Sequence, residues 1–230
     1  MISRVGRSSM LECCKFKLII FAVMGCLFTI NDTFSSDQNA LTAMDNKDCI
    51  FSGSFQQTRQ ITGLNDALDS SGQFFYHCNY GVIWKTTEPL TETLVLSKTD
   101  KNYQLQGDEI KRIRSRYSKI LSKLIINMMG SDKTQTSKDF EINQTEQFMV
   151  LTPKRKRIQR AIKSIEISDL SSQKTERRQV LMTDPNDRII KIISTKQTVF
   201  AEQTAISELA KECSDIAVIT TKECELLLTE

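Results

Sequence analysis

SGQFFYHCNYGVIWKTTEP, residues 71–89, decides the fold class of this chain. Aromatic and β-branched residues fill both halves of the stretch, and Asn79-Tyr80-Gly81 separates them. This is the pattern of two antiparallel strands joined by a tight turn. Similar stretches lie on either side, FSGSFQQTRQ at 51–60 and TETLVLS at 91–97. The sequence therefore predicts an antiparallel meander of four strands in this part of the chain.

Residue spacing also predicts which side chains share a face of this sheet, because side chains alternate along a strand. In the first hairpin we expect Phe51 to lie opposite Tyr76. In the second hairpin, with a turn centred on Tyr80, we expect Val82 to lie opposite Cys78. A third turn, around Pro89, places Leu94 and Leu96 on the same face of the sheet. The face predicted to be apolar carries Phe51, Phe55, Phe74, Tyr76, Val82, Trp84, Leu94 and Leu96.

The opposite face of the same strands is predicted to be mostly polar. Its members are Ser52, Ser54, Gln56, Gln73, His77 and Lys85, with Phe75 and Ile83 as apolar exceptions. A slip of one residue would move every side chain of a strand to the other face, so the assignment depends on the register. His77, the single histidine of the chain, is expected on the surface of its strand.

The N-terminus has the pattern of an export signal. An apolar run, LIIFAVMGCLFTI, follows several basic residues and spans 13 residues from position 18 to 30. A membrane span needs roughly 20 residues. We therefore predict a cleaved signal over residues 1–35 and export to the periplasm. There are two alternatives. The segment could be an uncleaved membrane anchor, or a lipid could be attached at Cys26 within Val23-Met24-Gly25-Cys26.

Four cysteines lie beyond this signal: Cys49, Cys78, Cys213 and Cys224. An even number of cysteines in an oxidising compartment favours disulfides, and four cysteines allow three pairings. The strand register places Cys49 opposite Cys78, which leaves Cys213 to pair with Cys224. Each bridge would add ~2–4 kcal/mol of stability. Free buried thiols are the alternative.

Residues 108–129 change from a strand period to a helical one. Apolar residues recur at spacings of three and four: Ile110, Ile113, Tyr117, Ile120, Leu121, Leu124, Ile125, Met128 and Met129. This pattern predicts an amphipathic helix that ends at Gly130. Its apolar stripe is either a cover for a lipid cavity or ordinary core packing. Its basic face is either simply solvated or approaches an anionic lipid or an acidic partner.

Strands are predicted to resume after this helix and to form a second meander. The stretches are 140–142, 146–153, 156–168, 176–183 and 187–195. Short helices are expected at 39–47 and 201–213. The basic run Lys154-Arg155-Lys156-Arg157 is interpreted as a turn or docking surface, because a net charge of only +3 gives no support for a nucleic-acid partner.

Several of these stretches resemble the LolA family of outer-membrane lipoprotein carriers. They are FSGSFQQTR (51–59), SGQFFYHCNYGVIWKTTEP (71–89), FMVLTPK (148–154) and DRIIKI (187–192). The resemblance covers residues 40–200 and is closest to the divergent LolA-related branch. It implies a mainly β fold with a helical lid, in which a curved antiparallel sheet forms an incomplete barrel and the helix at 110–129 supplies part of the lid. The chain would then divide into a signal (1–35), a carrier domain (36–200) and a C-terminal helix or tail (201–230).

The resemblance also implies a function without a chemical step. A monomeric periplasmic carrier would bind the acyl chains of lipoproteins in an apolar cavity. It would take them from an inner-membrane exporter and deliver them to an outer-membrane acceptor, with no cofactor, metal or nucleic acid. The lipid-contacting residues would be the apolar sheet residues named above together with Ile113, Tyr117, Ile120, Leu121, Leu124 and Met128.

One departure from the family pattern bears on how the lid closes. The family has an Arg-Pro pair near the end of the second strand, whose arginine helps to hold the lid, and Cys78-Asn79 stands there in this chain. The closing contact must therefore differ. Two other functions stay open: a carrier of a glycolipid or another acyl amphiphile, and a disulfide-stapled binding domain with a solid core. An enzyme is not expected, since the sequence has no Gly-x-Ser-x-Gly motif and no Gly-rich phosphate loop.

Overall fold

The computed structural model describes residues 48–60, 66–99, 101–114, 116–130, 133–145, 147–172, 174–201, 205–216 and 218–228. All of them belong to one compact unit, Gln38–Glu230. The signal predicted over residues 1–35 and the helix predicted at 39–47 lie outside the described residues.

Eleven strands form one antiparallel sheet. The first meander contains β1 (Ile50–Gln60), β2 (Ala67–His77), β3 (Gly81–Glu88), β4 (Glu92–Ser97), β5 (Asn102–Gln106) and β6 (Glu109–Ile113). The second contains β7 (Phe140–Gln144), β8 (Phe148–Pro153), β9 (Ser164–Asp169), β10 (Arg177–Thr183) and β11 (Ile189–Val199). The order across the sheet is β6-β5-β4-β3-β2-β1-β11-β10-β9-β8-β7, so the meanders join where β1 pairs with β11. The edge strands β6 and β7 do not pair with each other within the described residues, and the sheet is an open half-barrel, as predicted.

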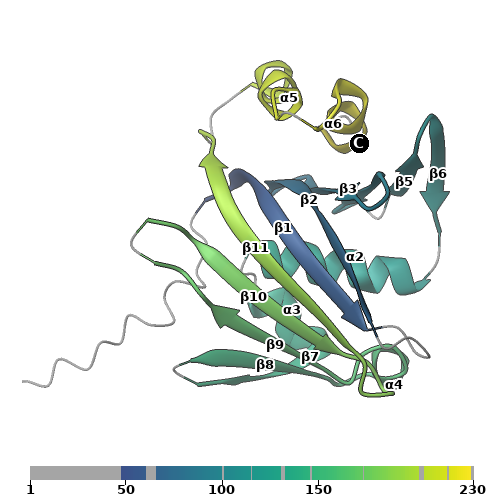
Figure 1. The fold of residues 1–230 in the computed structure, drawn as a ribbon, viewed down its shortest axis with the longest axis vertical. Helices are drawn as coiled ribbons and strands as arrows, with labels where there is room; N and C mark the ends of the chain where they lie inside the picture. Colours follow the sequence, from purple (N-terminus) through teal and green to yellow (C-terminus); the bar gives the residue numbers. More distant parts are fainter. Residues whose placement is uncertain are drawn as a thin grey trace, which may run out of the picture. The chain divides into compact units, whose positions relative to one another are not determined.

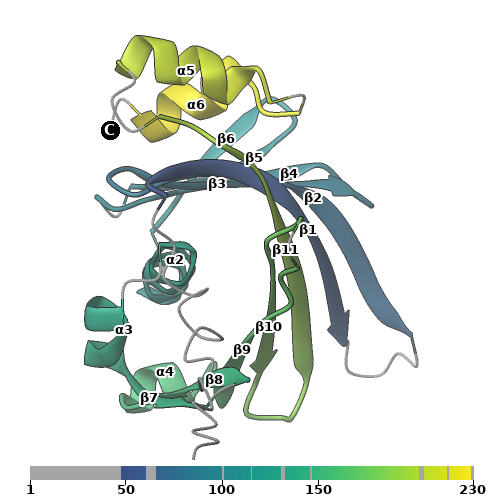
Figure 2. The ribbon, with the colours of Figure 1, turned by 90° about the vertical axis from the view of Figure 1, so that its left-hand side faces the viewer.

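Helices lie on both sides of this sheet. They are α2 (Arg116–Met129), α3 (Lys133–Asp139), α4 (Lys156–Gln159), α5 (Ile206–Ser214) and α6 (Thr221–Leu228). Figure 2 shows the sheet curving around α2, while α5 and α6 lie against its outer side. We call the side that faces α2 the concave face and the side that faces α5 and α6 the convex face. None of the helices in the described part of the chain is long and apolar enough to span a membrane.

The register of the first hairpin is as predicted, with Phe51 opposite Tyr76. The prediction for the second hairpin was wrong by two residues. Val82 pairs with Tyr76 instead of Cys78, because the turn is centred on Asn79. A shift of two residues keeps every side chain on its predicted face, since the side-chain period of a strand is also two. The face assignment therefore survives the error in register.

The helix predicted at 110–129 is shorter than expected. Its first part is instead strand β6, which pairs with β5 so that Ile110 lies opposite Leu105 and Ile113 opposite Asn102. Gly107, with a φ of 57°, makes the tight turn that returns the chain onto β5. The spacing of Ile110 and Ile113 resembled a helical turn only because it continued directly into the true helix.

The strand predicted over 156–168 also contains an error. Residues Lys156–Gln159 form the helical turn α4, and β9 begins only at Ser164. Ile158 and Ile162 are both buried in one cluster, and the Ile162 N–H donates to the Ile158 carbonyl at 2.9 Å. Their spacing of four was a helical signal that the strand interpretation missed.

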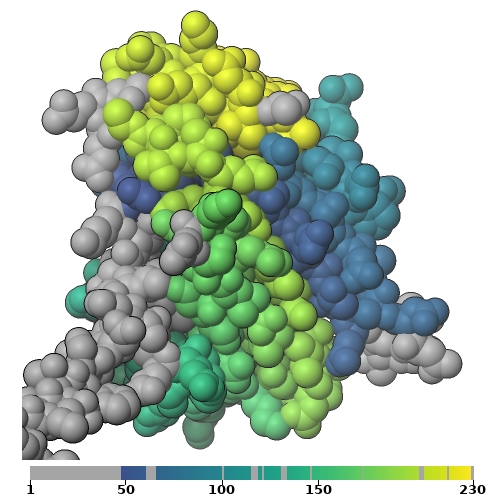
Figure 3. All heavy atoms as spheres, turned by 60° about the vertical axis from the view of Figure 1, so that its left-hand side comes forward, coloured from purple at the N-terminus to yellow at the C-terminus, as the bar shows by residue number. Residues whose placement is uncertain are grey.

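The prediction of a polar convex face is corrected by the C-terminal helices. The supposed exceptions Phe75 and Ile83 are fully buried there, in a cluster with Leu209 of α5 and Leu227 of α6. Figure 3 shows these helices (yellow) covering one end of the outer face, while β10 and β11 (green to yellow-green) reach the surface beside them. A helical hairpin therefore covers this part of the sheet, where the strand pattern predicted solvent.

A buried polar cluster joins this helical hairpin to the sheet. Glu223 of α6 lies between Lys85 Nζ, at 3.0 Å, and the Thr93 hydroxyl, at 2.5 Å. The Thr220 N–H donates to the same carboxylate at 2.7 Å. Burial opposes the charge on Glu223, but these hydrogen bonds outweigh it and hold the pKa of the carboxyl below its usual value. The cysteines of the two helices, Cys213 and Cys224, are bridged as predicted.

Candidate functional site

The concave face carries one apolar surface that runs far beyond the four strands analysed from the sequence. In the first meander it comprises the eight predicted residues, Phe51, Phe55, Phe74, Tyr76, Val82, Trp84, Leu94 and Leu96. The strand register continues it across the second meander through Ile190, Ile192, Val180, Met182, Ile165, Ile167, Met149 and Leu151. The surface thus extends from β4 to β8 without a change of face.

Aromatic rings form the densest part of this surface. Phe55 stacks on Trp84 with ring centroids 3.9 Å apart, and Phe74 lies 6.0 Å from the same ring. Each phenylalanine lies over a glycine of the neighbouring strand, Phe55 over Gly72 and Phe74 over Gly53. A Cβ on Gly72 would lie 2.9 Å from the Phe55 ring, and one on Gly53 would lie 2.6 Å from the Phe74 ring. The glycines therefore leave the space in which the rings lie flat against the sheet.

Helix α2 covers this surface. Ile126 is buried among the aromatic residues, and Ile125 and Met129 pack at the edge of the same cluster. Leu124, with Ile120 and Met128, packs against the part formed by the second meander. Where α2 packs, its own side chains occupy the space that the sequence assigned to cargo.

The helical residues proposed from the sequence have different outcomes. Ile120, Leu124 and Met128 lie against the concave face, as expected. Ile113 lies on the edge strand β6 instead of on the helix, and the side chains of Tyr117 and Leu121 lie outside the described residues. Sequence reasoning missed Ile126, which it could have found from the spacing of four and three between Ser122, Ile126 and Met129.

A side-chain contact on β5 holds the first half of α2. The Asn102 amide donates to the Ser122 hydroxyl at 3.0 Å, and both residues are buried. The Asn102 carbonyl oxygen in turn accepts from the Ser97 N–H at 3.0 Å. Asn102 is therefore fixed by the sheet and presents its NH₂ group to the helix.

An arginine on β10 holds the other end of α2. Arg178 Nη1 donates to the Met128 carbonyl at 2.7 Å. The last carbonyls of a helix have no partner within the helix, and a cation at that end also interacts favourably with the helix dipole. Burial lowers the pKa of the Arg178 guanidinium, against the opposing effects of Asp169 and Glu176. Arg178 on β10 thus joins the end of α2 to the second meander. The arginine of the family pattern lies on the second strand instead, where this chain has Cys78-Asn79.

The end of α2 also approaches the aromatic surface closely. A Cβ on Gly130 would lie 2.1 Å from the Tyr76 hydroxyl oxygen. The Gly130 N–H donates to the Ile126 carbonyl at 3.0 Å, which completes the last turn. The glycine predicted as a helix stop therefore also allows the helix to lie against the sheet.

The disulfide between Cys49 and Cys78 lies at the end of the β1–β2 hairpin, as predicted. Together with His77, these cysteines are the one group of possible metal ligands in the described part of the chain. The two sulfurs are bonded to each other and offer no thiolate. Contrary to prediction, His77 is buried, with its Nδ1 accepting from the Asn79 N–H at 3.0 Å. Burial, assisted by Lys98, lowers the pKa of His77 and favours its neutral ring.

An open antiparallel sheet with an apolar concave face under an amphipathic helix defines a half-barrel with a helical lid. The chain belongs to the LolA family, since the profile of "outer membrane lipoprotein carrier protein LolA" matches residues 49–208. Among solved structures, a LolA superfamily protein from Nitrosomonas europaea is similar at 10% identity, with a TM-score of 0.41, over 72% of this chain and 95% of that one. No curated protein matches the sequence. The family is one of lipoprotein carriers.

Proposed function

We propose that the protein carries the acyl chains of lipoproteins, or of related lipids, through the periplasm from the inner to the outer membrane. The observation that carries this proposal is the continuous apolar surface from β4 to β8 beneath α2. Residues 1–35 would act as a cleaved signal, 36–200 as the carrier domain and 201–230 as its C-terminal helical extension. An inner-membrane exporter and an outer-membrane acceptor would be the partners of the monomer, and no bond is made or broken.

Transport of an acyl chain through water is a problem of solvation. Each methylene exposed to water costs ~0.8 kcal/mol, so a chain of about 15 methylenes costs roughly 12 kcal/mol. Cargo that enters beneath α2 would replace Ile125, Ile126 and Met129 as the cover of the aromatic residues. One set of apolar contacts is exchanged for another, which keeps binding reversible. Methionine suits this exchange because its side chain adapts to different neighbours.

Helix α2 is held in a manner that permits the exchange. Its polar contacts with the sheet include Asn102–Ser122 and Arg178–Met128. A hydrogen bond contributes about 0.5–1.5 kcal/mol, or about 1.5–3 kcal/mol where one group is charged. Cargo that displaces the helix must offset these contacts and also the apolar packing of Leu124 and Ile126, which an acyl chain can replace in kind.

Binding of a fluorescent fatty acid to the delipidated protein tests this function. Trp84→Glu places a charge in the centre of the aromatic surface, and we expect it to abolish binding while the protein remains folded. Leu90→Glu is the matched control, because Leu90 is 72% exposed in the loop between β3 and β4. If the native protein binds no fatty acid and co-purifies with no lipid, a stapled binding domain with a solid core is the correct interpretation. Mass spectrometry of extracted cargo distinguishes lipoprotein from glycolipid or another amphiphile.

A further inference from the structure

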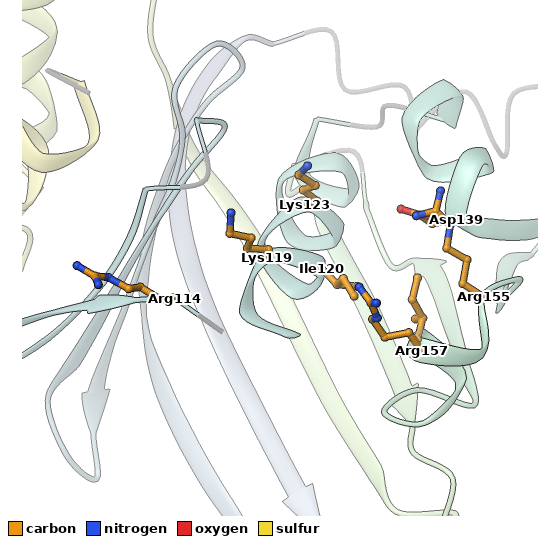
Figure 4. Close-up of a pocket in the computed structure, with 8 residues that line it drawn as sticks. Arg114, Lys119, Ile120, Lys123, Asp139, Arg155 and Arg157 are labelled. Atoms are coloured by element: carbon orange, nitrogen blue, oxygen red, sulfur yellow. Dashed lines mark ion pairs between the residues drawn. The ribbon is translucent and has the colours of Figure 1, made fainter. Parts of the chain in front are cut away.

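A basic cavity lies beside α2, at the end of the concave face formed by the second meander. Its volume is about 740 Å³. The cations that line it are Arg114, Lys119, Lys123, Arg155 and Arg157. Figure 4 shows Lys119 and Lys123 on α2, Arg155 and Arg157 across the cavity near α4, and Arg114 on the segment before α2. Segments that are distant in the sequence therefore contribute cations to the lining of one cavity.

The charge of this cavity is concentrated compared with the rest of the chain. Asp139 is the acidic residue in the lining, and it forms an ion pair with Arg155 Nε at 2.9 Å. Five cations less one carboxylate give the lining a charge of +4, whereas the whole chain has a net charge of +3. Without the proposed signal, residues 36–230 have a net charge of +1, so the described lining is far more positive than the remainder of the domain.

The cavity is also continuous with the apolar surface. Ile120 and Ile158 belong to its lining, and Ile158 is a buried member of the cluster that contains Leu124 and Leu151. A ligand in this hollow would have cations around its head, and its tail would reach the apolar concave face by displacing α2 from the cluster. An amphiphile with an anionic head and an acyl tail has the matching division of polarity.

We propose that this cavity binds the phosphate headgroup of an anionic amphiphile whose acyl chain lies on the concave face. The proposal rests on the carrier function and narrows its cargo to the related lipids, because the acyl anchor of a lipoprotein carries no phosphate. Arginine and lysine together suit phosphate, since arginine donates paired hydrogen bonds and lysine acts as a compact charge. The hollow shape and apolar lining favour a single lipid molecule over an acidic protein surface. The headgroup contact also selects cargo, because a neutral amphiphile of equal chain length lacks it.

The test uses the delipidated full-length protein and three soluble probes. Lysophosphatidic acid carries phosphate and an acyl chain, a monoacylglycerol of the same chain length carries no charge, and inorganic phosphate carries no chain. We expect lysophosphatidic acid to bind the native protein more tightly than either other probe, and increasingly so at low salt. The paired substitution Lys123→Gln with Arg157→Gln removes one cation from each side of the cavity. This double variant should bind lysophosphatidic acid roughly tenfold more weakly, and its affinity for monoacylglycerol should not change.

The matched control is Lys174→Gln with Lys222→Gln, which changes net charge equally at exposed sites outside the cavity. It should leave all affinities unchanged. Equal affinity for the charged and neutral lipids, with no effect of the cavity variant, would overturn the headgroup site while the carrier function stands. Phosphate alone binding as tightly as the lipid would reduce the cavity to an anion site and also overturn the proposal. If the variant instead lost only attachment to anionic vesicles, the surface would dock on membranes and the proposal would be wrong. Failure of every lipid to bind would remove the carrier function itself.

Discussion

The two faces of the sheet are both covered by helices, but they are held in different ways. On the convex face, α5 and α6 are joined by the Cys213–Cys224 disulfide and anchored by Glu223 against Lys85. On the concave face, the contacts of α2 include the two hydrogen bonds described above and the apolar packing of Leu124 and Ile126. The disulfide ties α5 to α6, so the buried contacts of Glu223 with Lys85 and Thr93 anchor both helices to the sheet, whereas α2 contains no cysteine. In the proposed carrier, α5 and α6 would form a permanent cover of the convex face and α2 a removable cover of the concave face.

The largest expected effect is on the permanent cover. Glu223→Ala removes the partner of Lys85 and leaves a buried cation, which costs about 3–5 kcal/mol for a buried ion pair. Urea unfolding should show this loss, while fatty-acid affinity of the folded variant stays close to native. Glu225→Ala, at an exposed position of the same helix, should cost far less. Similar losses in the two variants would mean that the Lys85–Glu223 pair does not anchor the helices.

A smaller effect is expected on the removable cover. Arg178→Ala deletes the charged donor to the Met128 carbonyl, at a cost of about 1.5–3 kcal/mol. Amide hydrogen exchange in α2 should accelerate, whereas exchange in α5 and α6 should not change. Arg177→Ala is the control, since Arg177 is exposed and faces the other way on the same strand. Uniform acceleration in all three helices would show that the two covers are not independent.

The smallest expected effect is the pH dependence of the stability that Glu223 gives to the convex cover. The pKa of Glu223 is held below its ordinary value of 4.5, so the folded state favours the carboxylate. This contribution is fully present above the unfolded pKa and is lost as pH falls through the folded value. The stability difference between the native protein and Glu223→Gln should therefore stay constant near neutrality and shrink below about pH 4.5. A constant difference down to pH 3 would contradict the assignment.

Local patterns predicted the first meander well. The side-chain period and the turn residues fixed the faces of Phe51, Phe74 and Trp84, and the same register predicted the Cys49–Cys78 bridge. Apart from the register of the second hairpin, the errors fell where a strand period and a helical period meet. Ile113 continued the apolar spacing of a helix although Gly107 turned it into a strand. A short window cannot separate these outcomes, because one turn of helix and a short strand share the same few apolar positions.

The sequence by itself determined the alternation of the strands, the aromatic face and the amphipathic character of α2, since each depends on neighbours within one hairpin or one helix. Only the tertiary structure decided what covers each face. Lys85 and His77 read as solvent-facing, yet both are buried, and Lys85 meets Glu223 across 138 residues of sequence. The pairing of β1 with β11 and the contact of Arg178 with Met128 are equally non-local. Such contacts depend on how the whole chain packs, and residue spacing carries no information about partners that the fold alone brings together.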